Sequence, residues 1–368
     1  MAAQAPRAAV ITPFFVDRDA VCNDAYHSAL ALRRIGWDAR IYAVSGQSER
    51  ERAYPLAELH QFIRSRDDLV YFHFSTGRRD VLEAIARIDC RKVLKFHNIT
   101  PPELFSMWSD ELAEANRLGR LEMGEIARLR WELVWGDSSF NLDEIKPMLP
   151  PGTPAAVLPP FHETDALLAH PRPARDDQGL PRLLSVGRIV QSKGHPFLLR
   201  VLRYLVHDLR TPVVLDIVGK PDHRLLAYLR MLELMVREFR LEPFVSFHGE
   251  IDSRALAGRY AEAAVFVCAS EHEGFCVPIV EAMAFGVPIV ALSTSAVPET
   301  VGDAGIVWDE RDPRRFAVTI QRLLNTPAER QWLGEQGRRR YAAKFANLII
   351  ERQLMAAVGT DAQRSPAT

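Results

Sequence analysis

The sequence has few cysteines, and those it has do not form a recognisable pattern. Only four of its 368 residues are cysteine, namely Cys22, Cys90, Cys268 and Cys276. None belongs to a C-x-x-C pair, and none has a histidine neighbour at zinc-ligand spacing, so a structural zinc site is not indicated. We therefore expect free thiols in a reducing compartment.

Charge excess and long apolar runs are also absent. Forty-six basic and 47 acidic residues leave a net charge of −1, so we expect no nucleic-acid partner. No stretch approaches 18 uninterrupted apolar residues, so no membrane-spanning helix is expected. The first 15 residues lack the basic segment and long apolar segment of a signal peptide. These absences predict a cytoplasmic protein.

What the sequence does have is a regular alternation of short apolar runs and longer segments of helical period. This alternation predicts an α/β fold with parallel sheets covered by helices on both faces. In the first half of the chain the expected strands are residues 8–12, 39–44, 69–74, 92–97 and 155–160. In the second half they are residues 183–187, 213–219, 245–249, 264–270, 287–292 and 305–308.

A length of 368 residues suits two domains better than one. The alternation breaks in a stretch rich in proline and charge, which predicts a linker at 163–180. We expect a first Rossmann-like domain at 1–162 and a second at 181–341. The chain is expected to end in helices at about 312–325 and 327–357, with residues 342–358 returning as a helix to the first domain. Ligands of such sheets bind beyond the carboxyl ends of the strands, so the cleft between two such domains is the expected site.

Two cations follow an expected strand in "SVGRIVQSKGHPFLL" (185–199). The strand ends near Gly187, the loop carries Arg188 and Lys193, and a helix begins near His195. Cations beside a helix N-terminus form an anion site, because the free N–H groups and the helix dipole also favour negative charge. The alternative is a strand–loop–helix connection with two solvated cations.

Two glutamates flank a turn and a helix start in "SEHEGFCVPIVEAMAFG" (270–286). The N–H groups near Gly274, Phe275 and Cys276 are expected to point out of the helix start toward an anion. Glu273 and Glu281 would repel that anion, so hydroxyl groups are their expected targets. The alternative reading, acids favoured by the helix dipole, suits Glu273 but not Glu281 in the middle of the helix.

Together, "EGFCVPIVE" and the upstream "VGRIVQSKG" resemble the motifs of retaining GT-B glycosyltransferases of the family-4 (glycosyl transferases group 1) type. The resemblance extends to "SFHGEID" (246–252) and "VGDAG" (301–305) and covers nearly the whole chain. "KFHNITPPELF" (95–105) resembles a subset acting in bacterial surface-polysaccharide assembly. The resemblance implies a GT-B fold, in which two Rossmann-like doubly wound domains face each other across a cleft. It also implies a nucleotide-diphosphate sugar donor and no metal cofactor.

The resemblance implies roles for individual donor-site residues. Arg188 and Lys193 correspond to the pair that neutralises the donor diphosphate. Glu281 corresponds to the acid that holds the ribose hydroxyls, and Glu273 to the acid near the hydroxyls of the transferred sugar. Gly274 and Phe275 would supply backbone contacts.

Two further positions gain roles from the resemblance. His97 corresponds to the histidine that faces the donor sugar from the first domain, although a histidine after an apolar run is otherwise more often structural. Gly219 lies where the family's loop passes near the nucleotide base. The mechanism implied is transfer with retention and without a protein nucleophile.

The first loop departs from the family, which has a glycine-rich segment there. Residues 12–24 contain no glycine, so Asn23, Asp24 or the following helix N-terminus would replace it, or the loop would serve the acceptor. The D-x-D at 17–19 does not follow a strand as metal-binding motifs of that type do, so no metal site is expected.

On the acceptor side, Phe105, Met107 and Trp108 lie close together in the sequence. They suit an acceptor platform, a contact with the membrane surface, or core packing. Arg78 and Arg79 could meet a lipid-linked pyrophosphate or be solvated at a helix start.

The expected function is retaining hexosyl transfer to a glycan or polyprenyl-linked oligosaccharide, in biosynthesis of polysaccharide or O-antigen type. GDP-mannose and UDP-hexose are the donors suggested, with a peripheral contact at the inner face of the membrane. The alternative is a GT-B nucleotide-sugar-binding protein without transferase activity, either epimerase-like or regulatory.

Overall fold

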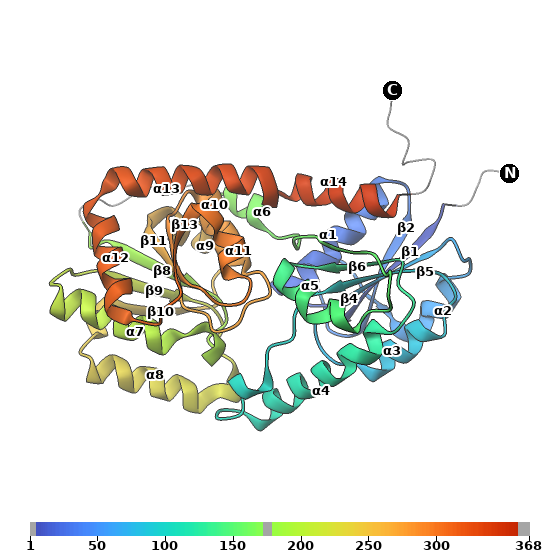
Figure 1. The fold of residues 1–368 in the computed structure, drawn as a ribbon, viewed down its shortest axis with the longest axis horizontal. Coiled ribbons are helices and arrows are strands. Elements are labelled where there is room, and N and C mark those ends of the chain that lie inside the picture. Colours follow the sequence, from blue (N-terminus) through green and yellow to red (C-terminus); the bar gives the residue numbers. More distant parts are fainter. Residues whose placement is uncertain (1–4, 172–178, 360–368) are drawn as a thin grey trace. The chain divides into compact units, whose positions relative to one another are not determined.

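The computed structural model of the chain describes residues 5–171 and 179–359 (Figure 1). By contact density it contains two compact units. Unit 1 consists of residues up to 101, residues 114–162 and those from 346 onward, and unit 2 consists of residues 102–113 and 163–345. Within the expected linker, residues 172–178 lie outside the described residues, as does the tail from residue 360.

Unit 1 is built on a seven-stranded parallel sheet in the order β3-β2-β1-β4-β5-β6-β7. Its strands are β1 (Arg7–Phe14), β2 (Asp38–Ser45), β3 (Tyr54–Pro55), β4 (Leu69–Phe74), β5 (Arg91–Phe96), β6 (Leu133–Gly136) and β7 (Ala155–Val157). The sequence interpretation missed β3 and β6. They have two and four residues, too few for an apolar run to stand out from its charged flanks.

Helices cover both faces of this sheet. They are α1 (Ala20–Arg34), α2 (Leu59–Phe62), α3 (Arg79–Ala86), α4 (Asp110–Ala127), α5 (Ser139–Ile145) and α14 (Asn347–Val358). Alternate residues of β1 enter different cores: Ala8 and Val10 pack with α1 and α14, whereas Ala9 and Ile11 pack with the core that α2, α3 and α4 cover. This is the doubly wound arrangement that the sequence predicted.

Unit 2 contains a six-stranded parallel sheet in the order β10-β9-β8-β11-β12-β13. Its strands are β8 (Arg182–Val186), β9 (Val214–Val218), β10 (Val245–Gly249), β11 (Ala263–Cys268), β12 (Ile289–Leu292) and β13 (Gly305–Trp308). Its helices are α6 (Thr164–Leu168), α7 (His195–Arg203), α8 (Leu226–Glu238), α9 (Ser253–Glu262), α10 (Val277–Phe285), α11 (Val297–Val301), α12 (Pro313–Asn325) and α13 (Pro327–Arg340). Short 3₁₀ turns join several of these elements.

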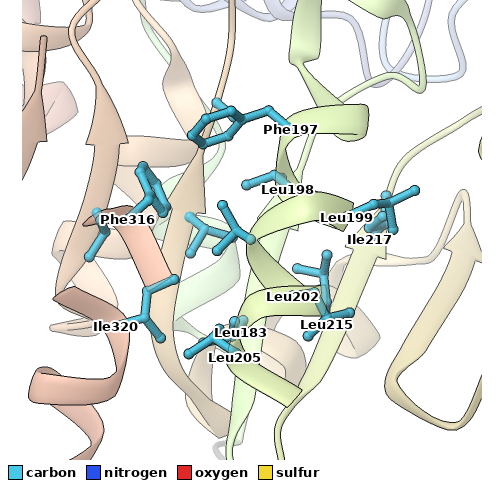
Figure 2. Packing of buried hydrophobic residues seen from close by; sticks show 14 of the residues in the cluster. Leu183, Phe197, Leu198, Leu199, Leu202, Leu205, Leu215, Ile217, Phe316 and Ile320 are labelled. Atoms are coloured by element: carbon cyan, nitrogen blue, oxygen red, sulfur yellow. The ribbon is translucent and has the colours of Figure 1, made fainter. Parts of the chain in front are cut away.

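One face of the unit 2 sheet packs against α7, α8 and α12. Figure 2 shows Leu202 of α7 beside Leu215 of β9, and Leu205, in the π-helical turn Tyr204–Asp208 that follows α7, beside Leu183 of β8. Phe316 and Ile320 of α12 lie on the other side. All of these side chains are at most 1% exposed. This core fixes where β8 and α7 lie, and therefore fixes the loop between them.

The structure differs from the sequence interpretation at three further places. The single helix expected over 327–357 is interrupted: α13 runs into a π-helical turn at Tyr341–Phe345, and α14 begins after Ala346, whose ψ of 134° is extended. The expected linker begins with the short helix α6. The 18-residue α4 was not anticipated, because charged residues and two glycines weaken its apolar period.

Three glycines let strand-end loops of unit 2 approach one another. Gly194 has φ +69°, and a Cβ there would lie 1.9 Å from the carbonyl oxygen of Ala269. A Cβ on Gly219 would lie 1.9 Å from the carbonyl oxygen of Gly187. Gly187 itself faces the stem of Lys193. The loops after β8, β9 and β11 are therefore packed backbone to backbone.

We predict that Gly194→Ala destabilises the protein by several kcal/mol, since both strain and overlap oppose the added methyl group. Gly249→Ala is the matched control. Gly249 has nearly the same φ, +63°, but nothing lies within 4 Å of its Cβ position, so only the backbone strain of about 1–2 kcal/mol applies. Urea unfolding of both variants checks this. Equal losses in the two variants would show that the close approach to Ala269 is not required.

Candidate donor and imidazole sites

The loop between β8 and α7 is joined to the loop between β11 and α10 by three contacts. Besides the approach of Gly194 to Ala269, the N–H of Glu271 donates to the carbonyl oxygen of Ser192 at 2.6 Å. Lys193 Nζ then donates to Glu273 Oε1 at 2.5 Å. The two sequence motifs, 80 residues apart, therefore meet through a lysine–glutamate ion pair.

Glu273 is held from several sides. The Ser270 hydroxyl donates to Glu273 Oε1 at 2.6 Å, and the N–H of Glu273 donates to Ser295 Oγ at 2.9 Å. Burial alone would raise the pKa of Glu273, but Lys193 and Ser270 hold it below its usual value. Burial opposes the charge of Lys193 in the same way, and Glu273 raises the pKa of the lysine in spite of it. Both groups are therefore ionised at neutral pH.

The Lys193 side chain is 22% exposed and that of Glu273 is 9% exposed. A pocket borders this pair, lined by Gly187, Lys193, His195, Cys268, Ser270 and Cys276 among others. Arg188, on the same loop as Lys193, is exposed. The arrangement brings cationic groups to an accessible strand end, where an anionic ligand can reach them.

The start of α10 carries the backbone groups expected to meet an anion. Cys276 caps this helix with φ +74°, a left-handed conformation that is uncommon outside glycine. Phe275 is buried, its ring lies edge-on to Phe345 at 5.5 Å, and its carbonyl accepts from Thr300. Gly274 is half-buried. Strain at Cys276 is maintained by this packing, as is common where a backbone is shaped for a ligand.

Glu281 lies in the middle of α10 and is buried. The hydroxyl of Tyr260, on α9, donates to Glu281 Oε2 at 2.6 Å. Burial raises the pKa of Glu281 to about 7 even though this hydrogen bond lowers it. In contrast to Glu273, Glu281 is not paired with a cation among the described residues.

The raised pKa of Glu281 makes stability fall as pH rises. Between its ordinary value of 4.5 and about 7, the folded state keeps a proton that the unfolded state has lost. Each pH unit across this window costs about 1.4 kcal/mol, so about 3 kcal/mol of stability is lost by pH 8.

We predict that Glu281→Gln, which is neutral at every pH, is about 3 kcal/mol more stable than the unsubstituted protein at pH 8 and about equally stable at pH 4.5. Urea unfolding at the two pH values measures this difference. Glu238→Gln, at an exposed position on α8, serves as the control and should show no such change. Parallel pH profiles for Glu281→Gln and the unsubstituted protein would contradict the assignment.

In unit 1, His97 belongs to a cluster that the sequence interpretation did not predict. Its Nδ1 lies 2.9 Å from Asp137 Oδ2, and its Nε2 lies 2.9 Å from His73 Nδ1. The two imidazole rings are stacked, with centroids 5.1 Å apart. The His97 side chain is only 3% exposed, and both of its ring nitrogens are bonded within unit 1. A role for His97 toward a sugar stays a prediction.

The parallel strands explain how this cluster forms. His73 on β4 is paired in register with Lys95 on β5, and Asp137 comes directly after β6, the next strand in the sheet. Asp24 reaches the same place from α1, with its Oδ2 2.7 Å from Lys95 Nζ. Asp24 therefore does not take the place of the missing glycine loop. It faces the interior instead.

The expected acceptor residues have local partners. Asn23 accepts from Arg50 at 2.9 Å, and Arg78 pairs with Asp80 at 2.6 Å. Trp108 lies edge-on to Tyr228 in unit 2, with ring centroids 5.3 Å apart, beside buried Phe105. Of the three apolar residues, Met107 alone is largely exposed, at 82%. Core packing, one of the readings left open for Phe105 and Trp108, is the one the structure shows.

Sequence reasoning missed the partners that complete both sites. Tyr260, Ser270 and Ser295 hold the glutamates of unit 2, and their sequence neighbours gave no sign of this. In unit 1 there was one usable signal: His73 and Lys95 are polar residues inside otherwise apolar strands. None of the helices formed by the described residues is long and apolar enough to cross a bilayer.

Two doubly wound domains, each built on a parallel sheet, are the architecture of the GT-B class of fold. Residues 170–340 match the family model described as glycosyl transferases group 1. This part of the chain, a little under half of its length, is therefore similar to the glycosyl transferases group 1 family.

The individual relatives are also named as sugar transferases. The chain is 32% identical over 191 residues to D-inositol 3-phosphate glycosyltransferase from Thermomonospora curvata, which is 49% of this chain and 44% of that protein. It is 38% identical over 90 residues to O-antigen chain mannosyltransferase B from Escherichia coli, 24% of each. The matches thus span less than half the length of these curated relatives.

Solved structures show the same fold over nearly the whole chain. The structure of Alr3699/HepE from Anabaena in complex with UDP-glucose superposes with a TM-score of 0.73 and 15% identity, covering 96% of this chain and 99% of that one. At this identity the likeness shows the fold alone.

Proposed function

We propose that this protein is a retaining hexosyltransferase that takes its sugar from a nucleotide-diphosphate donor held by unit 2. The observation that carries the proposal is the Lys193–Glu273 pair at the strand ends of the part of the chain that matches the group 1 family model. A diphosphate needs cations, and a sugar needs hydrogen-bond acceptors for its hydroxyls. The two motifs supply both at one place.

When the donor binds, the Lys193–Glu273 ion pair would open, and each side chain would contact a different part of the donor. Glu273 stays in place because Ser270 and Ser295 hold it. The flexible stem of Lys193 can turn toward a phosphate oxygen, and exposed Arg188 offers a fork for the same diphosphate. Glu273 is then released to accept from hydroxyls of the sugar. Glu281, next to Tyr260, is the proposed acceptor for the ribose hydroxyls.

In the transfer itself, the diphosphate leaves with added negative charge. Lys193 and Arg188 stabilise this charge as it develops, which is catalysis by preorganised electrostatics. Retention then needs no protein nucleophile, because the acceptor hydroxyl attacks from the face that the diphosphate leaves. The proton of that hydroxyl passes to the departing phosphate oxygen, so the charges balance.

The identity of donor and acceptor is proposed from relatives. One of them is named for an O-antigen chain and for mannosyl transfer, and a structural neighbour holds UDP-glucose. We therefore favour GDP-mannose or a UDP-hexose as donor. The acceptor is a glycan or polyprenyl-linked oligosaccharide, met at the inner face of the membrane in biosynthesis of polysaccharide or O-antigen type. No metal cofactor is required by this proposal, since cationic side chains take that role.

Lys193→Ala is expected to lower kcat by about a hundredfold, because one charge that stabilises the leaving diphosphate is removed. Release of the nucleoside diphosphate in steady-state assays measures this. Lys344→Ala, an exposed lysine of the same unit, is the control and should leave the rate unchanged. A folded Lys193→Ala variant with full activity would remove Lys193 from the mechanism.

The donor can be identified by thermal unfolding against UDP-, GDP-, ADP- and dTDP-sugars. A ligand at 100 times its Kd adds about 2.7 kcal/mol to the stability. We expect a shift with one nucleotide class, and its loss in Glu281→Ala. If no nucleotide sugar shifts the well-folded protein, the proposal of a nucleotide-sugar transferase fails, and an inactive or regulatory homologue becomes the better description.

A further inference from the structure

Unit 1 contains an ion pair that is shut away from water. The side chains of Asp24 and Lys95 are both 0% exposed and form an ion pair at 2.7 Å. Removing two charges from water costs several kcal/mol for each ion, and such a pair is often no more stabilising than apolar residues of the same size. Stability alone therefore does not explain this pair.

The surroundings of Asp24 suggest what it does. Its Oδ2 lies 3.5 Å from His73 Nδ1 and 3.5 Å from His97 Nε2. These are the two nitrogens that lie 2.9 Å apart and share one hydrogen bond. The carboxylate oxygen is therefore equally far from the two nitrogens that share the proton. An acceptor placed in this way stabilises a proton between the two rings, whichever nitrogen carries it.

The other contacts fix the positions of the cluster. Asp24 Oδ1 accepts from the N–H of Phe161 at 2.9 Å, and Lys95 Nζ donates to the carbonyl oxygen of Pro159 at 3.2 Å. At the far side, His97 Nδ1 lies 2.9 Å from Asp137 Oδ2, and a carboxylate there keeps the proton on Nδ1. The working nitrogen of His97 is therefore Nε2, the atom that meets His73.

We propose that Asp24 and Lys95 are positioning residues, which hold His73 and His97 as a single proton-sharing pair. Asp24 faces the shared proton, and Lys95 neutralises Asp24 so that a carboxylate can be kept there without water. Their effect on sugar transfer acts through His97, and it rests on the proposed function together with the role toward the donor sugar that the family resemblance implies for His97.

Other charged and titratable groups around the pair are consistent with this arrangement. The charged and titratable groups that interact with it are Asp24 of α1, Tyr71 of β4, Lys95 of β5 and Asp137 at the end of β6. Burial lowers the pKa of His73 to about 4 although Asp24 raises it, so His73 is neutral at pH 7. A neutral His73 can give or receive one hydrogen bond at Nδ1, as sharing requires.

A divalent metal is the rival occupant, because Asp24, His73 and His97 offer one ligand atom each within 4.8 Å of one another. Two imidazoles and one carboxylate suit zinc or iron. However, Lys95 already places a positive charge 2.7 Å from the carboxylate oxygen that the metal would need. A metal ion beside that ammonium group would face strong repulsion, so the shared proton is the better occupant.

The test replaces the pair as a whole, in the variant Asp24→Asn/Lys95→Met. Removing both charges leaves no buried ion uncompensated, and the amide oxygen keeps an acceptor for Phe161. Three measurements are made: thermal unfolding, ¹H–¹⁵N spectra of the histidine ring nitrogens, and kcat with a donor-induced thermal shift. We expect a folded protein, altered ring-nitrogen signals for two histidines, a kcat lowered by about a hundredfold, and an unchanged donor shift.

Unchanged ring-nitrogen signals and an unchanged kcat in the folded double variant would show that the ion pair is only structural, and would overturn the proposal. If the protein has no transferase activity at all, the proposed function fails, but the ring-nitrogen comparison still decides whether Asp24 and Lys95 position the histidines.

Two further measurements are made on the unsubstituted protein and do not depend on the double variant. A single ring proton coupled to nitrogens of two histidines is expected, assigned by its loss in His97→Gln, and its absence would overturn the proposal even if the double variant does not fold. Metal analysis of the purified protein is expected to find no stoichiometric zinc or iron. One zinc or iron ion per chain would show that the cluster is a metal site, and would overturn the proposal of a shared proton.

Discussion

A charged group that is shut away from water must find its counter-charge within the protein, and this constraint shapes both clusters described above. In unit 2 it joins Lys193 to Glu273, and in unit 1 it joins Lys95 to Asp24. Parallel sheets make such pairs possible, because the carboxyl ends of neighbouring strands bring loops distant in sequence to one edge.

The two pairs differ in exposure, and that difference separates their proposed roles. The Lys193 side chain is 22% exposed, so its ammonium group can form an ion pair with a ligand that arrives from solvent. Lys95 is 0% exposed, so its charge serves only the groups around it. Glu281 differs from both pairs, because it is buried without a cation beside it in the described part of the chain and has a pKa raised to about 7. A ribose that donates hydrogen bonds to its carboxylate would relieve that cost.

Much of the fold could be predicted because apolar periodicity reports burial directly. The α/β alternation, the doubly wound sheets and the strand–loop–helix setting of Arg188, Lys193 and Glu273 all follow from local patterns. What the patterns could not give were contacts between distant segments. Nothing near Tyr260 indicates that it meets Glu281, and nothing near Asp24 indicates Lys95, 71 residues away, because these pairings depend on strand order and register.

Helices and strands with a weak apolar periodicity could not be predicted from the sequence for a related reason. The charged α4 and the two-residue β3 are stabilised by tertiary packing, which a single sequence does not display. The same holds for Trp108, whose contact with Tyr228 could be known only after the 102–113 segment was seen to pack in unit 2.

Donor binding through Lys193 and Glu281 can be seen in a crystal structure of the protein with the nucleoside diphosphate of the selected donor. We expect a phosphate oxygen within hydrogen-bond distance of Lys193 Nζ, with the Lys193–Glu273 pair opened and the ribose hydroxyls on Glu281. A nucleotide bound elsewhere, with that ion pair intact, would refute donor binding through these residues.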